Sequence, residues 1–502
     1  MARSEVAAER WSELDGLRQG FLTRCEKYSQ LTIPKICPVT GYNQNSQELS
    51  RDFQSVGAQC VNHLSNKLAL TLFAPSRPFF RLEVSDEAAQ QFEAIGMTAQ
   101  KLAEILSTGE RKALKEMDKR ALRPKLIEVL KHLLVTGNVL LILDKNKPRV
   151  IGIKSYVVKR NTYGEVIELL IKDDVLFDQL DEKVQELTEL KHHKADDKVC
   201  HYKWLKKDGK DYKLTQWVEK TQLPKEFDGK WPEKKMPYRV LTWDLADNDD
   251  YGTGHVEDYI GDLSALSGLS KALIEAGILM AEFRWLLNPA SSLSVEDFMN
   301  SPNGGVIPGQ QGDLSPVQAG VSQVFQQLAP QISVHTSSLG RGFLLTSATT
   351  RDAERVTARE ISLQANELET SLGGAYSRIS VDLQIPLAYF LLEAINFKVD
   401  GKDFEPMVVT GLDALSRTSD VDNLLGFLAD LAQIQQLNPN ANLVGLVSLS
   451  EVASAIAAGR GIDSTKIMAS EQQIQQVQEQ ALMAPGPGGQ QAQPGMPDQT
   501  PI

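Results

Sequence analysis

The 502-residue sequence predicts an α+β protein that is mainly helical. Two observations predict this class. Apolar residues recur at three- and four-residue intervals before residue 135 and again after residue 254, as they do on amphipathic helices. Between these regions, short runs alternate apolar and polar residues and are separated by glycine and proline, which is typical of antiparallel strands.

Helices are predicted for most of the first 135 residues. Residues 7–30 are expected to form one amphipathic helix that ends at Ile33 and Pro34. In residues 52–73, apolar side chains recur every four positions and predict a second helix: Val56, Cys60, Leu64, Leu68 and Leu72. Two further helices are predicted over about 98–117 and 123–134.

Strands are predicted from residue 135 to residue 245. The run 135–143 is rich in β-forming residues and follows a turn. Residues 155–160 and 166–172 are expected to form a hairpin through Asn161–Gly164. Alternating runs within 199–245 predict further antiparallel strands. The first 250 residues are therefore interpreted as one α+β domain.

The chain becomes helical again after residue 254. One apolar stripe predicts a helix over about 255–286, roughly 48 Å long at 1.5 Å per residue. Residues 287–320 are full of glycine and proline, apart from a short capped turn at Ser294–Asp297, and another helical region covers 321–345.

A small, polar segment of alternating charge follows at 346–356 and leads into a long helix. Thr357 and Glu360 have the spacing of a capping box and predict the start of that helix. Gly373, Gly374 and Pro386 predict kinks in it. Short helices are expected within 411–480, including a second capping box at Ser470–Gln473, and the Pro-, Gly- and Gln-rich residues 481–502 predict a disordered tail.

The net charge of −12 argues against a general nucleic-acid binder, which would carry a basic face. The four cysteines, Cys25, Cys37, Cys60 and Cys200, form no C-x-x-C pair and favour reduced thiols in an intracellular setting. The first residues lack the apolar core of a signal peptide, and no apolar run is long enough to span a bilayer.

Two groups of residues could suggest a metal, and both favour a simpler interpretation. Asp247–Asp258 partly matches a calcium loop, but Tyr251 stands at position 5 and position 12 lacks Glu, so an acidic turn is favoured. The group His192, His193, Cys200 and His201 does not have the spacing of a zinc site and favours a solvated hairpin.

Motifs for catalysis are missing from the sequence. Gly252–Gly254 does not continue into a dinucleotide loop, and neither a phosphate-binding loop nor a G-x-S-x-G elbow occurs. We therefore predict no enzymatic activity, no cofactor and no metal. By composition alone, the arginines at 341, 351, 355 and 359 favour an ordinary solvated face, because they alternate with acids at ion-pair spacing.

Six segments, taken together and in order, resemble a known family. They are DFQSVGAQCVNHLSNKLALTLF, RPFFRL, LKHLLVTGNVLLIL, SYVVKRNTYGEVIELL, YGTGHVEDYIGDLSAL and ERVTAREISLQANELETSLGGAYS. They resemble the portal, or head-to-tail connector, proteins of short-tailed bacteriophages that encode an RNA polymerase (the podovirus or autographivirus type). The resemblance spans about residues 10–420; residues 287–320 and the C-terminal tail contribute little to it.

The resemblance implies a portal fold assembled as a ring, normally a dodecamer, at one capsid vertex. Viral DNA would pass through its channel during packaging and ejection. The implied parts are an α+β wing (1–253), a stem helix (254–286), a small clip (287–320), a second stem helix (321–345), a tunnel loop (346–356), a long kinked helix and its return (357–410), a helical crown (411–480) and the tail (481–502).

The family also implies site residues and partners. The tunnel-loop residues expected to face the DNA are Thr346, Ser347, Thr349, Thr350, Arg351 and Arg355. Arg341 and Lys271 are further candidates to face the channel, and Gly373 and Gly374 mark the helix kink. The implied partners are other copies of the chain, double-stranded DNA, the terminase motor, the tail adaptor protein, and the capsid and scaffold proteins, but no membrane. The protein would assemble in the host cytoplasm and reside in the virion.

The implied ring also accounts for two features of the sequence. Net acidity with sparse arginines would let DNA slide, because tight phosphate binding would stall it. Long one-stripe helices would bury their stripes against neighbouring subunits. Two alternatives remain open: a cytosolic enzyme with an α+β catalytic domain and a helical oligomerisation domain, which needs a convergent polar pocket in the first 250 residues, and a membrane-docking scaffold, which the sequence disfavours because it has no basic amphipathic helix.

Overall fold

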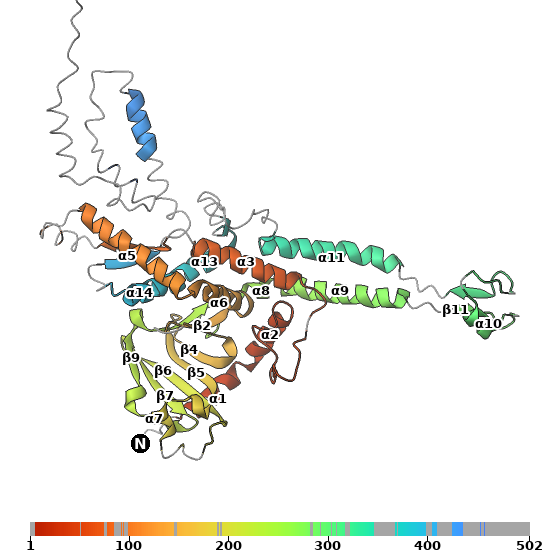
Figure 1. Ribbon diagram of the computed structural model, residues 1–502, viewed down its shortest axis with the longest axis horizontal. Coiled ribbons are helices and arrows are strands. Elements are labelled where there is room, and N and C mark those ends of the chain that lie inside the picture. The colour runs from red at the N-terminus through yellow and green to blue at the C-terminus, as the bar shows by residue number, and fades with distance from the viewer. Residues whose placement is uncertain are drawn as a thin grey trace, which may run out of the picture. The chain divides into compact units, whose positions relative to one another are not determined.

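The computed structural model (Figure 1) divides into two compact units, Met1–Ala414 and Leu415–Ile502. The described residues are 6–50, 52–74, 78–84, 92, 94, 99–144, 148–187, 190, 193–281, 285–291, 293–302, 304–307, 309–316, 322–345, 367–368, 370–397, 404–408, 424–434, 452 and 456. In the second unit, residues 424–434 form a helix, within the range 411–480 where short helices are predicted. The predicted tunnel loop, both capping boxes and the tail lie outside the described residues.

The N-terminal region forms two helices, α1 (Ala7–Leu17) and α2 (Gln19–Gln30), so the prediction of one helix over 7–30 is wrong. The break is at Arg18, where φ is −101° and ψ is 7°. Gly16 and Gly20 flank the break and weaken the helix there.

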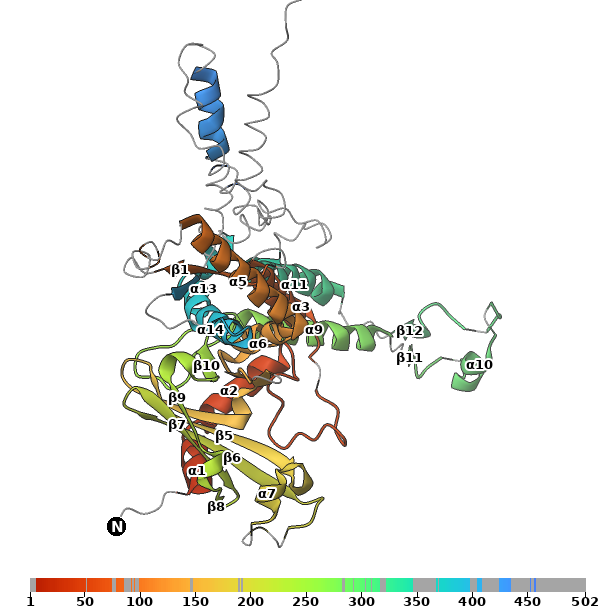
Figure 2. The same cartoon turned by 60° about the vertical axis from the view of Figure 1, so that its left-hand side comes forward.

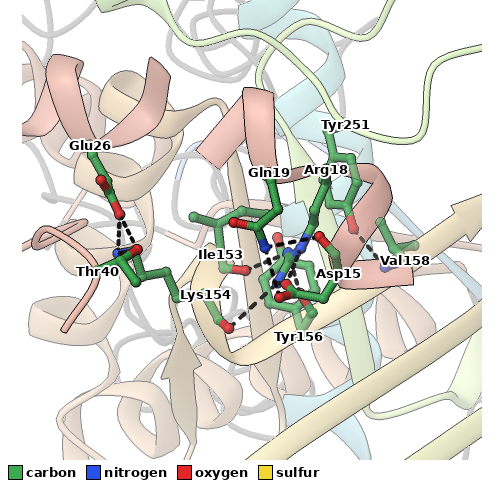
Figure 3. Close-up of polar contacts among 10 residues, drawn as sticks. All are labelled: Asp15, Arg18, Gln19, Glu26, Thr40, Ile153, Lys154, Tyr156, Val158 and Tyr251. Atoms are coloured by element: carbon green, nitrogen blue, oxygen red, sulfur yellow. Dashed lines mark hydrogen bonds and ion pairs between the residues drawn. The ribbon is translucent and has the colours of Figure 1, made fainter. Parts of the chain in front are cut away.

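Arg18 itself explains why the break is stable. Its side chain is buried, and it donates hydrogen bonds to the carbonyl oxygens of Ile153 at 2.7 Å and Tyr156 at 2.6 Å (Figure 3). Its guanidinium also lies between the rings of Trp11 and Tyr251, at 5.7 and 5.6 Å from their centroids. A straight helix would lose this contact with the sheet, which the local sequence pattern does not encode.

Helix α3 (Val56–Leu72) confirms the predicted four-residue stripe, because Cys60, Leu64, Leu68 and Leu72 are all buried. Each fully buried leucine contributes about 2 kcal/mol from apolar burial. Helices α5 (Ala99–Lys119) and α6 (Leu122–Thr136) also occur where they were predicted. The largest apolar core lies among α3, α5, α6 and the later helix α14 (Ile385–Ala394).

Gly137 ends α6 and starts the next strand. Its φ is +72°, and a Cβ there would lie 2.4 Å from the backbone carbon of Thr253 and 2.6 Å from the carbonyl oxygen of Gly252. Only glycine fits this conformation and this close approach. The chain therefore turns within one residue from α6 into β2 (Asn138–Ile142), so the strand begins three residues later than the predicted run 135–143.

Two antiparallel sheets follow, which confirms the predicted α+β class. The smaller has the order β10-β2-β3, with β3 Arg149–Ile151 and β10 Tyr238–Thr242. The larger has the order β4-β5-β6-β7-β8, with β9 paired to β7. Its strands are β4 (Tyr156–Arg160), β5 (Val166–Leu176), β6 (Lys198–Asp208), β7 (Asp211–Val218), β8 (Thr221–Gln222) and β9 (Gly229–Pro232). The short helix α7 (Glu182–Gln185) lies between β5 and β6.

The predicted helix over 255–286 is shorter and interrupted. Helix α8 (His255–Asp258) is separated from α9 (Ile260–Ala281) at Tyr259, where φ is −108° and ψ is 12°. At about 1.5 Å per residue, α9 is roughly 33 Å long. Residues Trp285–Leu287 form strand β11, which pairs with β12 (Leu314–Pro316), so pairing with distant residues replaces the predicted end of the helix.

Between β11 and β12, helix α10 (Val295–Asn300) starts with the predicted cap, in which Ser294 Oγ accepts a hydrogen bond from the Asp297 amide at 3.0 Å. Helix α11 (Ser322–Gly342) then returns beside α9. Figures 1 and 2 show the pair running side by side from the helical core toward β11 and α10.

After residue 366, the backbone at Gly373 leaves helical geometry, with φ 50° and ψ −122°. Helix α13 (Gly374–Ile379), a π-helical stretch over Ser380–Gln384 and α14 follow without a gap. Pro386 lies directly after the π-helical stretch; proline lacks an amide donor, and both features are recognised causes of bends in a continuous helix. A strand pair that was not predicted joins β1 (Phe80–Val84) to β13 (Phe404–Val408).

Candidate functional site

Helices α9 and α11 form the candidate site, and polar contacts near their inner ends set their register. Asp262 Oδ1 accepts a hydrogen bond from His335 Nδ1 at 2.9 Å, and Asp262 Oδ2 accepts one from Ser338 Oγ at 2.9 Å. The hydrogen bond from His335 holds the pKa of Asp262 below its usual range. Because the start of α9 faces the end of α11, the two helices are antiparallel.

Apolar burial along this pair decreases away from the core. Leu263 and Leu266 of α9 and Leu339 of α11 are buried. Farther out on α9, Ile274 is 47% exposed and Ile278 is 56% exposed; on α11, Val334, the neighbour of His335, is 65% exposed. In the predicted stripe, Leu263 and Leu266 at the inner end and Ala276 farther out are buried and Leu273 is half-buried, whereas Ile274 and Ile278 lie off the stripe and are exposed.

Large apolar side chains are also exposed where the pair ends. They are Trp285, Leu286, Val295, Met299 and Val306. The Trp285 ring packs edge-on against Phe298, at 5.6 Å between centroids. Clusters of exposed apolar side chains of this kind are typical of interaction surfaces. We call residues 285–316 the tip of the helix pair.

The predicted DNA-facing residues are placed as follows. Thr346, Ser347, Thr349, Thr350, Arg351 and Arg355 lie outside the described residues. Arg341 is exposed in the last turn of α11, where the helix dipole favours a cation. Lys271 is exposed on α9, with its Nζ 3.8 Å from Glu275 and 5.7 Å from the centre of the Phe53 ring.

Arg341 and Lys271 are not brought together. Lys271 follows Asp262 by about two and a half turns, so it lies roughly 14 Å outward along α9. Arg341 follows Ser338, the partner of Asp262, toward the core. The two cations therefore lie at different heights on the pair.

Three residues that the sequence interpretation missed contact the chain on either side of the predicted loop. His255 Nε2 lies 3.0 Å from the Gly342 carbonyl oxygen, and His63 Nε2 lies 3.2 Å from that of Leu344. Lys67 Nζ donates to Glu367 Oε2 at 2.7 Å. The only available signal was polar residues within apolar helical patterns, which does not identify their partners.

The residues considered for metals have other contacts. Tyr251 Oη accepts a hydrogen bond from the Val158 amide at 3.1 Å, and its ring stacks on Phe21. His201 Nε2 lies 2.9 Å from Gln216 Oε1, while His193 packs against Phe177; His192 lies outside the described residues. Within the described ranges, no three His, Cys, Asp or Glu side chains cluster to hold a metal ion.

The cysteines in the structure are free thiols. Burial raises the pKa of Cys37 and of Cys60 to about 11, which makes both poor nucleophiles at neutral pH. None of the helices in the described part of the chain is long and apolar enough to cross a membrane.

A cavity of about 870 Å³ lies between β2, β10 and α14. Two of its charged side chains have structural partners: Arg149 Nη2 lies 3.0 Å from Asp173 Oδ1, and the Arg120 guanidinium lies over the Phe390 ring. These contacts position the helices against the sheet and do not pair a nucleophile with a base. The cavity therefore gives no support to the alternative of an enzyme.

Known proteins resemble this chain over most of its length. The family model for bacteriophage head to tail connecting proteins matches residues 4–468. The portal protein of Enterobacteria phage SP6 is 33% identical over 423 residues, covering 83% of this chain and 81% of that protein. The portal protein of Escherichia phage T7 is 30% identical, with 95% and 90% covered, and that of Pseudomonas phage phiKMV is 32% identical, with 95% and 94% covered.

Among solved structures, a chain in the neck of an empty gene transfer agent particle has 12% identity and a TM-score of 0.36, covering 82% of this chain and 90% of that chain. This TM-score is too low for the structural similarity to support an argument. The family model and the relatives, in contrast, extend over nearly the whole sequence. The chain therefore belongs to the bacteriophage head-to-tail connecting proteins, the portal proteins.

Proposed function

We propose that copies of this chain form a ring, normally of twelve subunits, around a channel at one capsid vertex. Viral DNA passes through this channel during packaging and ejection. The observation that carries the proposal is the uncovered apolar surface of α9 and α11, including Ile274, Ile278 and Val334. A ring covers such a surface, because the outer part of each helix pair packs against the next subunit.

The charges on the helix pair support a channel that does not grip DNA tightly. The chain carries a net charge of −12, and the exposed cations Arg341 and Lys271 lie at different heights. Around a ring, each would form a separate, sparse circle of positive charge. Weak contacts spread along the axis attract phosphates without binding many at once, so DNA can slide.

We assign the parts of the chain to this function as follows. Residues 1–253 are the wing, 254–286 and 321–345 the stem, 287–320 the clip, 346–356 the tunnel loop, 357–410 the long kinked helix and its return, and 411–480 the crown. Thr346, Ser347, Thr349, Thr350, Arg351 and Arg355 face the DNA. The exposed apolar tip supports the clip as the place where the terminase motor and later the tail adaptor dock.

Portal proteins are structural parts of the virion, and a role without catalysis is consistent with membership of this family. We infer that the ring assembles in the host cytoplasm with capsid and scaffold proteins and needs no cofactor.

The proposal is tested by imaging the purified full chain with negative stain and measuring its mass by light scattering. We expect rings with a central hole and a mass near twelve subunits. A monodisperse monomer at micromolar concentration would contradict the proposal.

A further inference from the structure

The chain on both sides of residues 345–366 contacts the same helix, α3. His63 Nε2 of α3 lies 3.2 Å from the carbonyl oxygen of Leu344, and Lys67 Nζ of α3 donates to Glu367 Oε2 at 2.7 Å. His63 and Lys67 are one helical turn apart, which is about 6 Å along the axis. Leu344 and Glu367 are therefore held near each other, although the segment between them could extend about 70 Å.

The first of these ends is the C-terminus of α11, where the last carbonyl groups have no partners within the helix. Two histidines occupy this position. His255 Nε2 lies 3.0 Å from the Gly342 oxygen, and His63 Nε2 reaches Leu344, whose φ of 56° is the left-handed conformation common after helix ends. Burial lowers the pKa of both histidines, which favours neutral rings that donate from Nε2.

Close packing also fixes this end. The Phe343 ring is buried and lies 4.9 Å from His255 and 5.3 Å from Tyr259, between ring centroids. A Cβ on Gly342 would lie 2.3 Å from the Tyr259 ring. The exit of the chain from α11 is therefore determined by α3 and α8 together.

The second end is held by a charge-assisted hydrogen bond and by apolar burial. The Lys67 side chain is only 8% exposed, whereas that of Glu367 is 37% exposed. Leu368, the next residue, is fully buried in the main core. A bond from a buried ammonium to a carboxylate is stronger than a neutral one, and the neighbouring leucine keeps the two in register.

We propose that His63 and Lys67 are positioning residues that hold Leu344 and Glu367, the residues on either side of 345–366, against α3. The two residues that flank this segment are then fixed by α3, a core helix of the proposed wing, as well as by the stem. The proposal rests on the proposed function only in taking residues 346–356 as the DNA-facing loop. It predicts that disturbing α3 at these two side chains changes the segment without changing the sheets.

The test uses trypsin, since Arg351, Arg355 and Arg359 provide cleavage sites inside the segment. Purified rings of the normal chain, Lys67→Met, Glu367→Gln and His63→Leu are digested, and cleavage at each arginine is followed by mass spectrometry. We expect each variant to be cleaved roughly fivefold faster, the factor that corresponds to about 1 kcal/mol. Lys183→Met is the matched control, because it also removes a lysine–glutamate pair. Lys183 Nζ lies 3.2 Å from Glu226 Oε2, and this pair is exposed and distant in sequence from residues 345–366.

Two further variants distinguish loss of the Lys67–Glu367 contact from general unfolding as the cause of faster cleavage. The combined Lys67→Met and Glu367→Gln change should be no worse than Lys67→Met alone, because Lys67→Met already removes the ammonium that pairs with residue 367. The exchange Lys67→Glu with Glu367→Lys should restore part of the protection. Thermal unfolding is measured in parallel, and Glu367→Gln, at a partly exposed position, is expected to fold normally.

Unchanged cleavage in Lys67→Met and Glu367→Gln rings would overturn the proposal. DNA packaging is assayed separately on the same variants. Faster cleavage with normal packaging would support the anchoring by α3 and would count against the DNA-facing assignment of the loop. The two proposals can therefore fail independently.

Discussion

At the scale of single residues, polar side chains that reach across the sequence determine local geometry. Arg18 breaks the N-terminal helix because its guanidinium binds two carbonyl groups in the loop before β4 and at its first residue. A lysine there could not make the same set of planar contacts between Trp11 and Tyr251. Buried polar groups of this kind couple segments that lie far apart along the chain.

His132 predicts sensitivity to acid. Its Nδ1 atom is buried and has no hydrogen-bond partner among the described side chains, and burial lowers its pKa to about 4. The pKa of histidine in the unfolded chain is near 6.5. Protonation therefore favours the unfolded chain below about pH 6.5, and the stability that neutral His132 allows is lost as the pH falls toward 4. The loss amounts to at most about 3 kcal/mol.

We expect the thermal midpoint of the normal protein to fall more steeply between pH 6.5 and 4.5 than that of His132→Leu. The comparison is made by circular dichroism at matched ionic strength. Parallel pH profiles for the two proteins would show that His132 does not titrate on unfolding.

The loop arginines give a second prediction at this scale. Replacing Arg351 and Arg355 with Ala should leave ring assembly intact and impair DNA packaging or retention, because the proposed tunnel loop would lose its contacts with phosphates. Packaged DNA is measured in assembled particles, with Lys119→Ala, an exposed lysine of α5, as the control. Failed assembly with normal packaging by the remaining rings would exclude the tunnel-loop assignment.

At the scale of elements, long-range contacts determine where α9 ends and how it is aligned with α11. After α9 the chain forms strand β11, which pairs with β12. The hydrogen bonds of Asp262 with His335 and Ser338 set the register between α9 and α11. Hydrogen bonds to one carboxylate are directional, whereas apolar contacts between helices are not. The polar contacts select one alignment.

We therefore expect Asp262→Ala to lower the stability of the rings by at least about 1 kcal/mol, since two hydrogen bonds to a carboxylate are lost at a partly exposed site. The effect of Asp262→Ala with His335→Ala should be smaller than the sum of the two single effects. The midpoints are measured by thermal unfolding. Strictly additive effects would mean that the two side chains do not interact in solution.

At the scale of the whole molecule, a single copy leaves much apolar surface in water. Ile274 and Ile278 on the stem, and Trp285 and Met299 on the tip, are among its exposed large side chains. A soluble monomer rarely retains such a series of exposed apolar groups. Association with neighbouring copies removes it from water, and this is the main driving force that we infer for ring formation.

Ile278→Glu should therefore prevent ring formation and leave the chain folded, because it places a charge in the proposed interface while the side chain is already 56% exposed in one copy. Light scattering reports the mass and circular dichroism reports the fold. Deletion of residues 484–502 is the control, and we expect it to form normal rings. Normal rings of Ile278→Glu would place the interface elsewhere.

Much of the fold could be predicted because it follows local periodicity. The stripe of α3, the strands β2, β4 and β5 and the cap of α10 lie where the residue pattern places them. The site was harder to predict, because Lys67 and His63 are ordinary polar residues on a helix until their partners Glu367 and Leu344 are known. A pattern along one element carries no information about what that element touches.

The sequence by itself determined the α+β class, most helices and strands and the resemblance to portal proteins, since periodic burial and ordered segments are properties of the linear chain. Only the tertiary structure decided that the N-terminal helix breaks at Arg18, that α9 gives way to the pairing of β11 with β12, that β1 pairs with β13, and that α3 contacts both sides of residues 345–366. Each of these depends on hydrogen bonds and packing between residues far apart in sequence, whose energies exist only once the chain is folded.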